Sequence, residues 1–525
     1  MEINEVNVLR ITRYFLWSIL GLLSLFFVLE LALSLAWRME HDTPLLHYVA
    51  FLIDKHNFVP YRDVFETSMV GTFLFHLAIG KFFGYSDLAF RIVDVVYLSS
   101  LLFISWYFMK PFGKVVALTG PLIFGVYYLE QGPSMSLQRD CVGILPIALS
   151  LLIARKNNDL NRLNYTAAAI GALFALSASI KPHLAIGLPA VLIYMLLKCQ
   201  DSEQDYQKST FVHSLKFFLY AALGFIITLS IPLLWLWQTG GLPYFWEIFS
   251  SYIPLHLHLS TDHRTIEGME RWLYLLNSYR KLGGWQILLI PISLGTYLLF
   301  STNTTKRETK FAILLLSLLL FYSIYPVLSG QFWNYHWMPF VYFGSLCASF
   351  ILLPAPQEQS STWNHIIPQF IFIVFLFITI YPTENFVRQL AGDSPAPPKE
   401  GRVDAIADFL KKNLRPGDTV QPLDWTGGTI HGMLMAEAVA ATPFIYDYHF
   451  YHHISQPYIQ ELRKRFVQDL TEARPRYIIH MLKMPRPYGK DTTSKFLELQ
   501  DFIINNYFVV FKTNEFTIWE RKYAH

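Results

Sequence analysis

YFLWSILGLLSLFFVLELALSLA, residues Tyr14 to Ala36, is the stretch that decides the fold class. A helix needs roughly 20 mostly apolar residues to cross about 30 Å of hydrocarbon, and this run supplies them with a single charged side chain, Glu30. The run contains no small-residue cleavage site, and Arg10 and Arg13 precede it. We therefore expect a retained first membrane helix whose N-terminus stays in the cytoplasm.

The composition of the whole chain points the same way. Of 525 residues, 53% are hydrophobic and only 15% are charged, and the mean hydropathy of +0.32 is atypical of soluble proteins. Further apolar runs predict an all-α, polytopic membrane domain of about eleven spans over residues 1–385. Runs shorter than about 17 residues are either half-sunk helices around a polar cavity or helices that extend beyond these boundaries. The further runs are 88–109, 115–128, 141–154, 165–180, 183–198, 217–237, 285–300, 311–329, 337–354 and 363–382.

Lys and Arg concentrate in alternate connections between these runs, which the positive-inside rule assigns to the cytoplasm. The remaining connections then lie outside, including the first outer loop, residues 37–87, and an odd number of spans places the C-terminus outside as well. The compact first and fifth outer loops and the absence of an endoplasmic-reticulum retention signal at Lys522 to His525 favour a bacterial inner membrane. The basic connections contain Lys110 and Lys114; Arg155, Lys156 and Arg162; Lys198, Lys208 and Lys216; and Lys306, Arg307 and Lys310.

The apolar character ends near residue 385. A proline-containing linker, residues 386–400, leads into residues 401–525, which we predict to form a small α/β domain outside the membrane. The net charge of +3 does not favour nucleic-acid binding, and the three cysteines show no CxxC spacing, so neither a disulfide framework nor a zinc site is indicated. The expected helices are 401–414, 456–471 and 492–506, and the expected strands are 418–424, 476–480 and a pair within 507–520.

Charged side chains in the first outer loop form the first candidate site. Arg62, Asp63 and Glu66 follow a predicted amphipathic helix, 43–55, and a Pro-Tyr break. If the segment is helical, the two carboxylates share a face, which suits a general base supported by a second acid or a divalent metal such as Mg or Mn. The alternative is structural, with Asp63 and Glu66 capping the following helix.

Two further polar clusters lie on the predicted outer side. In EQGPSMSLQRD, residues 130–140, Arg139 and Asp140 are either functional or a local pair at a helix start. The turn of Lys181, Pro182 and His183 joins two short apolar runs, so it lies below the outer surface. There Lys181 needs an anionic partner, either a carboxylate or a phosphate, unless it snorkels to the interface.

Aromatic and histidine-rich segments complete the candidates. GQFWNYHWMP, Gly330 to Pro339, contains interface aromatics together with Asn334, Tyr335 and His336. The outer loop 238–284 carries His256, His258, His263 and Arg264, and could contribute to an acceptor site. In the C-terminal domain, YDYHFYHH, residues 446–453, could stack on sugar rings, bind a metal or form a surface loop.

The outer-side motifs together resemble the membrane glycosyltransferases of the GT-C superfamily, notably the protein O-mannosyltransferase and lipid A aminoarabinose transferase relatives. The resemblance spans roughly residues 10–385 and depends on the order and the side of the motifs. Many relatives carry one or two prolines shortly after the acidic motif, where this chain has Thr67, Ser68 and Met69. The motifs are PYRDVFE (60–66), FFGYSDLAFR (82–91), QRD (138–140), SIKPH (179–183) and FWNYHWMP (332–339).

The resemblance implies an inverting transfer of a sugar from a polyprenyl-phosphate donor to a hydroxyl of a lipid, a glycan or a protein. It makes Asp63 the base, and it makes Glu66 a group that orients Arg62 or shares a divalent ion with Asp63. Cations would meet the leaving phosphate, since its charge rises as the bond breaks. The implied ligands of the donor phosphate and sugar are Arg62, Arg139, Asp140, Lys181, His183, Asn334, Tyr335 and His336.

Two other classes remain open at the level of sequence. A transporter or flippase for lipid-linked sugars would show inverted repeats and charges at the bilayer midplane. An O-antigen ligase or polymerase would have its main outer loop late in the chain rather than after the first helix, and the 238–284 loop keeps that alternative open.

Overall fold

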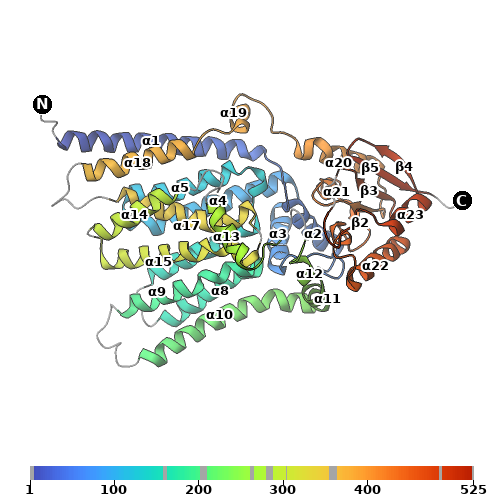
Figure 1. Ribbon diagram of the computed structural model, residues 1–525, viewed down its shortest axis with the longest axis horizontal. Helices are drawn as coiled ribbons and strands as arrows, with labels where there is room; N and C mark the ends of the chain where they lie inside the picture. Colours follow the sequence, from blue (N-terminus) through green and yellow to red (C-terminus); the bar gives the residue numbers. More distant parts are fainter. Residues whose placement is uncertain are drawn as a thin grey trace. The chain divides into compact units, whose positions relative to one another are not determined.

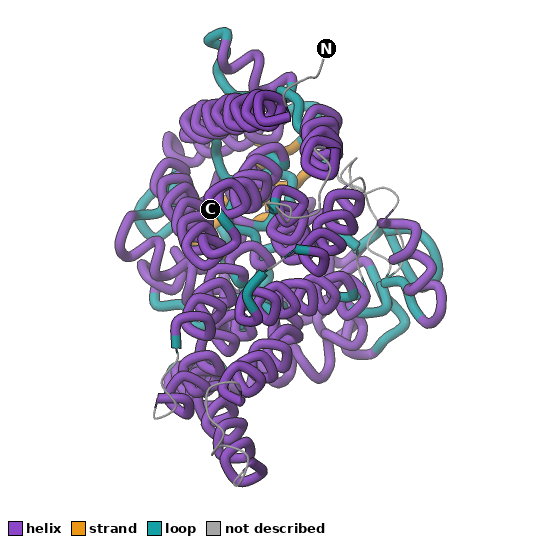
Figure 2. Tube along the Cα trace, turned by 90° about the vertical axis from the view of Figure 1, so that its left-hand side faces the viewer, coloured by secondary structure: helices purple, strands orange, loops and turns teal. Residues whose placement is uncertain are grey.

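The computed structural model of the chain describes residues 5–157, 162–200, 210–259, 265–279, 288–302, 304–330, 332–353, 363–483 and 487–522. It is largely helical, and its strands belong to one five-stranded sheet (Figure 2). The chain forms two compact units. The helical unit comprises Met1–Trp37, Ile92–Ser230 and Ile266–Ser394, and the mixed unit comprises Arg38–Arg91, Ile231–Thr265 and Pro395–His525.

Over the described residues, each of the predicted apolar runs coincides with helical structure, because a chain in hydrocarbon must satisfy its backbone polar groups internally. Five helices are long and apolar enough to cross a membrane among the described residues, and a bent pair, Ile366–Thr379 with Glu384–Leu390, would make a sixth. The count of about eleven is therefore not confirmed. The helices are α1 (Glu5–Leu33), α4 (Asp87–Met109), α5 (Lys114–Glu130), α7 (Ile144–Lys156), α8 (Leu163–Ile180), α9 (Leu188–Gln200), α10 (Thr210–Gln238), α13 (Gly268–Tyr279), α14 (Leu289–Ser301), α15 (Lys306–Ser323), α16 (Tyr325–Ser329), α17 (Met338–Ala348), α18 (Trp363–Thr379) and α19 (Glu384–Leu390).

Local breaks explain why several runs fall short of a full span. Gly143 separates the short helix α6 (Arg139–Val142) from α7. A 3₁₀ segment, Pro182–Gly187, precedes α9, and another, Asn334–Trp337, precedes α17. These breaks place polar side chains at helix ends, which is where the sequence motifs QRD, KPH and NYH lie.

Small residues set the packing of α8 against α10 within the helical unit. A Cβ atom added at Gly171 would lie 2.0 Å from the carbonyl oxygen of Ala221, and one added at Gly224 would lie 2.0 Å from that of Ala168. Only glycine permits such a close backbone approach, a familiar feature of helix pairs in membranes. The most apolar window of α10 is only 17% buried, so its other faces are suited to contact with lipid.

The mixed unit contains the sheet, in the order β2-β1-β3-β5-β4. Strand β1 pairs in parallel with β2 and β3, whereas β5 pairs antiparallel with β3 and β4. Helix α21 lies in the connection from β1 to β2, and α22 lies in the connection from β2 to β3 (Figure 1). The strands are β1 (Thr419–Leu423), β2 (Val439–Ala440), β3 (Tyr477–Met481), β4 (Tyr507–Lys512) and β5 (Phe516–Arg521), and the helices are α20 (Arg402–Asn413), α21 (Thr429–Met435), α22 (Pro457–Ala473) and α23 (Leu497–Asn506).

All the helices and strands predicted for residues 401–525 are present with small shifts of their ends. Helix α21, the two-residue strand β2 and a 3₁₀ segment, Tyr448–Tyr451, were not predicted. In the first outer loop, the predicted amphipathic helix is α2 (Thr43–His56), and a second helix, α3 (Val70–Phe83), follows the acidic motif. The loop 238–284 contains α11 (Leu242–Glu247) and α12 (Ile253–His256), while His263 and Arg264 lie outside the described residues.

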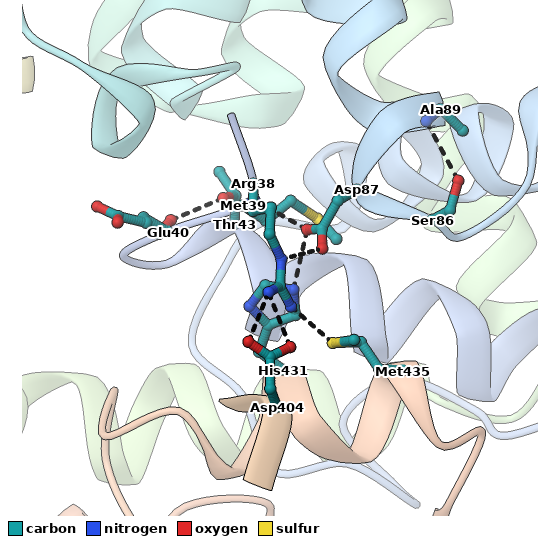
Figure 3. Close-up of polar contacts among 10 residues, drawn as sticks. All are labelled: Arg38, Met39, Glu40, Thr43, Ser86, Asp87, Ala89, Asp404, His431 and Met435. Carbon is teal, nitrogen blue, oxygen red and sulfur yellow. Dashed lines mark hydrogen bonds and ion pairs between the residues drawn. The ribbon is translucent and has the colours of Figure 1, made fainter. Parts of the chain in front are cut away.

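The first outer loop folds together with the C-terminal domain inside the mixed unit (Figure 3). The guanidinium of Arg38 contacts Asp87 Oδ2 and Asp404 Oδ1, each at 2.8 Å. On the other oxygen of Asp87, Oδ1, His431 Nε2 lies at 2.9 Å and the Met39 amide donates at 2.9 Å. The compact unit thus takes in more of the chain than the predicted domain 401–525.

Candidate active site

The acidic motif forms a tight turn rather than a helix, and we call residues 59–68 the acidic turn. The Asp63 amide donates to the carbonyl oxygen of Val59 and the Tyr61 amide to that of Val64, both at 2.9 Å. Tyr61 takes a positive φ of 69°, which a helix cannot contain. The shared helical face expected for Asp63 and Glu66 is therefore wrong.

The alternative interpretation, helix capping, is also wrong. Helix α3 begins at Val70, its N-cap is Met69, and no side chain caps it. Asp63 and Glu66 bond instead to partners within and beside the acidic turn.

Asp63 is a half-exposed carboxylate held by two neighbours. Its Oδ2 accepts from the Val59 amide and from Arg62, each at 2.8 Å, and its Oδ1 accepts from Arg62 Nε at 2.9 Å. Partial burial raises the pKa of Asp63, but the hydrogen bonds from Arg62 and Val59 outweigh it and hold the pKa below its ordinary value. Since 30% of its side chain is exposed, this anion can be reached from outside.

Glu66 has a different environment, since only 4% of it is exposed. Its Oε1 accepts from the Ser68 amide at 3.0 Å and from Ser68 Oγ at 2.8 Å, and its Oε2 accepts from Tyr446 Oη at 2.8 Å. The expected link from Glu66 to Arg62 is not formed, because Arg62 pairs with Asp63. A proline at position 68 has no amide hydrogen and could not donate to Glu66. Ser68, where many relatives carry proline nearby, therefore supplies a hydrogen bond that holds Glu66.

A divalent ion shared by Asp63 and Glu66 does not fit this arrangement. The guanidinium of Arg62 binds both oxygens of Asp63, and the oxygens of Glu66 already accept from Ser68 and Tyr446. Among the described residues, no group of three or more His, Cys, Asp or Glu side chains is placed to hold a metal ion.

A second cluster forms in the helical unit around Asp140, which is fully buried. Lys181 Nζ lies 2.9 Å from both carboxylate oxygens of Asp140, and Tyr325 Oη donates to Oδ1 at 2.6 Å. The anionic partner of Lys181 in this structure is therefore a carboxylate, and the Lys181 side chain is only 14% exposed. Asp140 pairs with Lys181 rather than serving only as a local partner of Arg139.

Aromatic rings surround this ion pair. Nζ of Lys181 lies 5.6 Å from the centre of the Tyr325 ring and 5.5 Å from that of Tyr335, within the range of cation–π attraction. The ring of Tyr325 also lies 6.4 Å from that of His336 and 6.2 Å from that of His183. The structure thus brings five of the predicted residues together, whereas Asn334 is exposed.

Two residues that support this cluster, Tyr325 and Asp94, were not among the predicted site residues. Tyr325 was missed, because it lies inside the apolar run 311–329; the Tyr-Pro pair at 325–326 was the only signal for a break there. Asp94 holds the loop that precedes α6, because its carboxylate accepts hydrogen bonds from the Leu137 amide at 3.3 Å and from Tyr128 Oη. This anchor sets the start of α6, which carries Arg139 and Asp140.

The stretch 446–453 is not the surface loop that we considered. Tyr448, His449, Phe450 and Tyr451 are all buried. His449 Nδ1 lies 2.8 Å from Tyr252 Oη, so this segment packs against the 248–252 segment inside the mixed unit.

Comparison with solved structures shows a fold similar to that of a membrane protein bound to a lipid phosphate, in agreement with the resemblance inferred from the motifs as far as the fold is concerned. Two structures of ArnT from Cupriavidus metallidurans match along almost the whole chain. The one bound to undecaprenyl phosphate has a TM-score of 0.57 at 10% sequence identity, covering 96% of this chain and 97% of that chain. The apo state gives a TM-score of 0.55 at 11% identity with the same coverage.

A weaker likeness is found to the archaeal oligosaccharyltransferase AglB from Archaeoglobus fulgidus in complex with an inhibitory peptide and a dolichol-phosphate. Its TM-score is 0.46 at 12% identity, with 89% of this chain and 69% of that chain covered. No family model matches the sequence, and no curated protein matches it significantly. At these identities the likeness concerns the fold alone.

Proposed function

We propose that this chain is an integral membrane glycosyltransferase that moves a sugar from a polyprenyl-phosphate donor to an acceptor hydroxyl on the outer face of the membrane. The acceptor is a hydroxyl of a lipid, a glycan or a protein. The observation that carries the proposal is Asp63, an accessible carboxylate beside an arginine in the first outer loop of a chain with this fold. The fold shared with ArnT, a structure of which holds undecaprenyl phosphate, supports the donor class.

In the proposed reaction Asp63 takes the proton of the acceptor hydroxyl as its oxygen attacks the anomeric carbon. The bond from that carbon to the phosphate oxygen breaks on the opposite face, so the sugar is transferred with inversion and the lipid phosphate leaves. General-base assistance of this kind contributes about 10²–10⁴-fold to the rate.

Arg62 sets the basicity of Asp63 in this proposal. While Arg62 binds both oxygens of Asp63, the pKa of Asp63 is held low and the carboxylate is a weak base. A phosphate that attracts the guanidinium would remove those hydrogen bonds and raise the pKa of Asp63. The arrival of the donor would then strengthen the base.

The other cations are assigned to the leaving phosphate by the same chemistry. Lys181 and Arg139 are the proposed phosphate ligands of the helical unit, with Tyr335, His336 and His183 beside Lys181. Since Asp140 binds Lys181 in this structure, a phosphate must compete with that carboxylate, whereas Tyr325 can remain on Asp140. We also propose about eleven spans, a cytoplasmic N-terminus and an extracytoplasmic C-terminal domain, as in a bacterial inner-membrane protein.

The test is transfer of labelled sugar by the purified protein in lipid, from a panel of polyprenyl-phosphate sugars that differ in the sugar. We expect transfer from at least one donor, with the anomeric configuration of the product inverted as read by NMR. A product with retained configuration would exclude the direct displacement by an acceptor oxygen. Donor binding without any transfer would favour a transporter of lipid-linked sugars, and transfer from diphosphate-linked glycans alone would favour a ligase.

A further inference from the structure

The acidic turn does not hold its shape alone. Its Phe65 amide donates to the carbonyl oxygen of Pro443 at 2.8 Å, a backbone hydrogen bond to the C-terminal domain. The Phe65 ring packs at 5.4 Å from that of Phe444 and at 4.7 Å from that of His449. We call residues 443–449, which follow β2, the brace segment.

Tyr446 of the brace segment provides the polar part of this contact. Its hydroxyl donates to Glu66 Oε2 at 2.8 Å, and both donors to the other oxygen belong to Ser68 inside the acidic turn. Among the contacts of the described residues, Tyr446 is therefore the one side chain from outside the turn that binds Glu66. The exposed fraction of Glu66 is 4%, so bulk water does not replace a lost donor without rearrangement.

A third segment, residues 248–252, contacts both the acidic turn and the brace segment through Tyr252. The ring of Tyr252 lies 5.2 Å from that of Phe65, and its hydroxyl lies 2.8 Å from His449 Nδ1. Within the turn, Tyr61 Oη donates to the carbonyl oxygen of Ser68 at 2.6 Å. The half of the turn that contains Glu66 is thus held by the brace segment, by Tyr252 and by Tyr61, while the Asp63 side chain is 30% exposed.

We propose that Tyr446 is a positioning residue: by holding Glu66 it fixes the acidic turn in the conformation that presents Asp63 to the acceptor. This role rests on the proposed function, because it matters to a rate only if Asp63 acts on a substrate. It gives the C-terminal domain an indirect part in catalysis, through a side chain that touches neither the substrate nor the reacting atoms.

Without the hydroxyl of Tyr446, the carboxylate of Glu66 would rotate or admit water to satisfy Oε2. Either change disturbs the bonds between Glu66 and Ser68, and Glu66 lies only three residues from Asp63 in the same turn. A displacement of about 1 Å at a reacting group can reduce a rate on the order of 10²-fold. Affinity for the donor should change far less, because Tyr446 is not proposed to touch it.

The chain offers a matched control in Tyr48. Its hydroxyl donates to the carbonyl oxygen of Ala438 at 2.8 Å, so it too joins the first outer loop to the C-terminal domain through a tyrosine hydroxyl. Tyr48→Phe and Tyr446→Phe therefore each remove one hydrogen bond between the same two parts of the mixed unit, a buried bond at Tyr48 and a partly buried one at Tyr446. Only Tyr446→Phe removes a bond to the acidic turn.

The experiment compares both variants with the wild type in full-length protein in lipid, by steady-state transfer and by hydrogen exchange of peptides that cover residues 59–68. We expect Tyr446→Phe to lower kcat about 10- to 100-fold with little change in KM for the donor, and to speed exchange in the acidic turn. We expect Tyr48→Phe to leave kcat within about twofold and exchange in that turn unchanged. In an Asp63→Asn background, Tyr446→Phe should reduce the residual rate no further, since both act through one group.

Two outcomes would overturn the role of Tyr446 while transfer by the wild type still supports the function. One is an unchanged kcat in Tyr446→Phe, whether or not exchange in the acidic turn is faster. The other is an equal loss of kcat in both tyrosine variants that follows their melting temperatures. Absence of transfer by the wild type from every donor would instead overturn the proposed function and this role with it.

Discussion

At the scale of single residues, the two carboxylates of the acidic motif differ in exposure and in hydrogen-bond partners. Asp63 is accessible and paired with Arg62, while Glu66 is buried and bound by Ser68 and Tyr446. Burial and partners, rather than spacing along the chain, decide which of the two can meet a substrate. The sequence pattern alone left them equivalent.

The low pKa of Asp63 predicts the pH profile of transfer. A base whose pKa lies below its ordinary value stays ionised as the pH falls, so kcat/KM should show no acid limb from Asp63 between pH 7 and about pH 5. Arg62→Gln removes the charge and the hydrogen bonds that lower this pKa, so the acid limb should move to higher pH. A profile of kcat/KM for both proteins checks this, and an acid limb that stays in place in Arg62→Gln would contradict it.

At the scale of elements, apolar runs were a good guide to helices because hydrocarbon leaves the backbone few alternatives. The conformation of the acidic turn was not predictable, since it depends on Pro60, on the positive φ of Tyr61 and on partners distant in sequence such as Tyr446. Strand β2 is too short for a periodic signal. In the second cluster, the pairing of Asp140 with Lys181 joins residues 41 positions apart, so no local pattern could predict it.

The contact between α8 and α10 yields a prediction about packing. Gly171→Ala or Gly224→Ala would place a methyl group 2.0 Å from a carbonyl oxygen, so the helices must separate, and we expect a loss of about 1–3 kcal/mol of stability. Gly21→Ala is the control, because a Cβ at Gly21 in α1 meets nothing within 4 Å. Thermal unfolding in detergent measures the difference. Equal melting temperatures for Gly224→Ala and Gly21→Ala would show that α8 and α10 do not approach so closely.

At the scale of the whole molecule, the compact units do not follow the order of the chain. The mixed unit draws on the first outer loop, on residues 231–265 and on the C-terminal region. A soluble domain appended after the last span would be expected to fold by itself, but here Arg38, Tyr48 and Glu66 of the first loop bind Asp404, Ala438 and Tyr446 respectively. The domain is therefore part of the structure that shapes the acidic turn.

Substitution of Arg38 tests whether its ion pairs join the first outer loop to the C-terminal domain (Figure 3). Arg38→Gln removes the pairs with Asp87 and Asp404, and we expect a lower melting temperature, with a cost on the order of 1 kcal/mol because these groups are partly exposed. Arg388→Gln is the control, since the Arg388–Glu384 pair is largely exposed and should contribute little. Limited proteolysis should also cut residues 386–400 faster in Arg38→Gln. Unchanged cleavage and melting would mean that the cluster does not join the loop to the domain.

The most direct test of the central claim compares Asp63→Asn with Asp404→Asn for transfer from the donor that the wild type uses. Both substitutions neutralise a partly exposed carboxylate that pairs with an arginine in the mixed unit. If Asp63 is the base, Asp63→Asn lowers kcat by about 10²–10⁴-fold with the donor still bound, and Asp404→Asn transfers nearly as well as the wild type. Transfer by a folded Asp63→Asn protein at the wild-type rate would contradict the assignment.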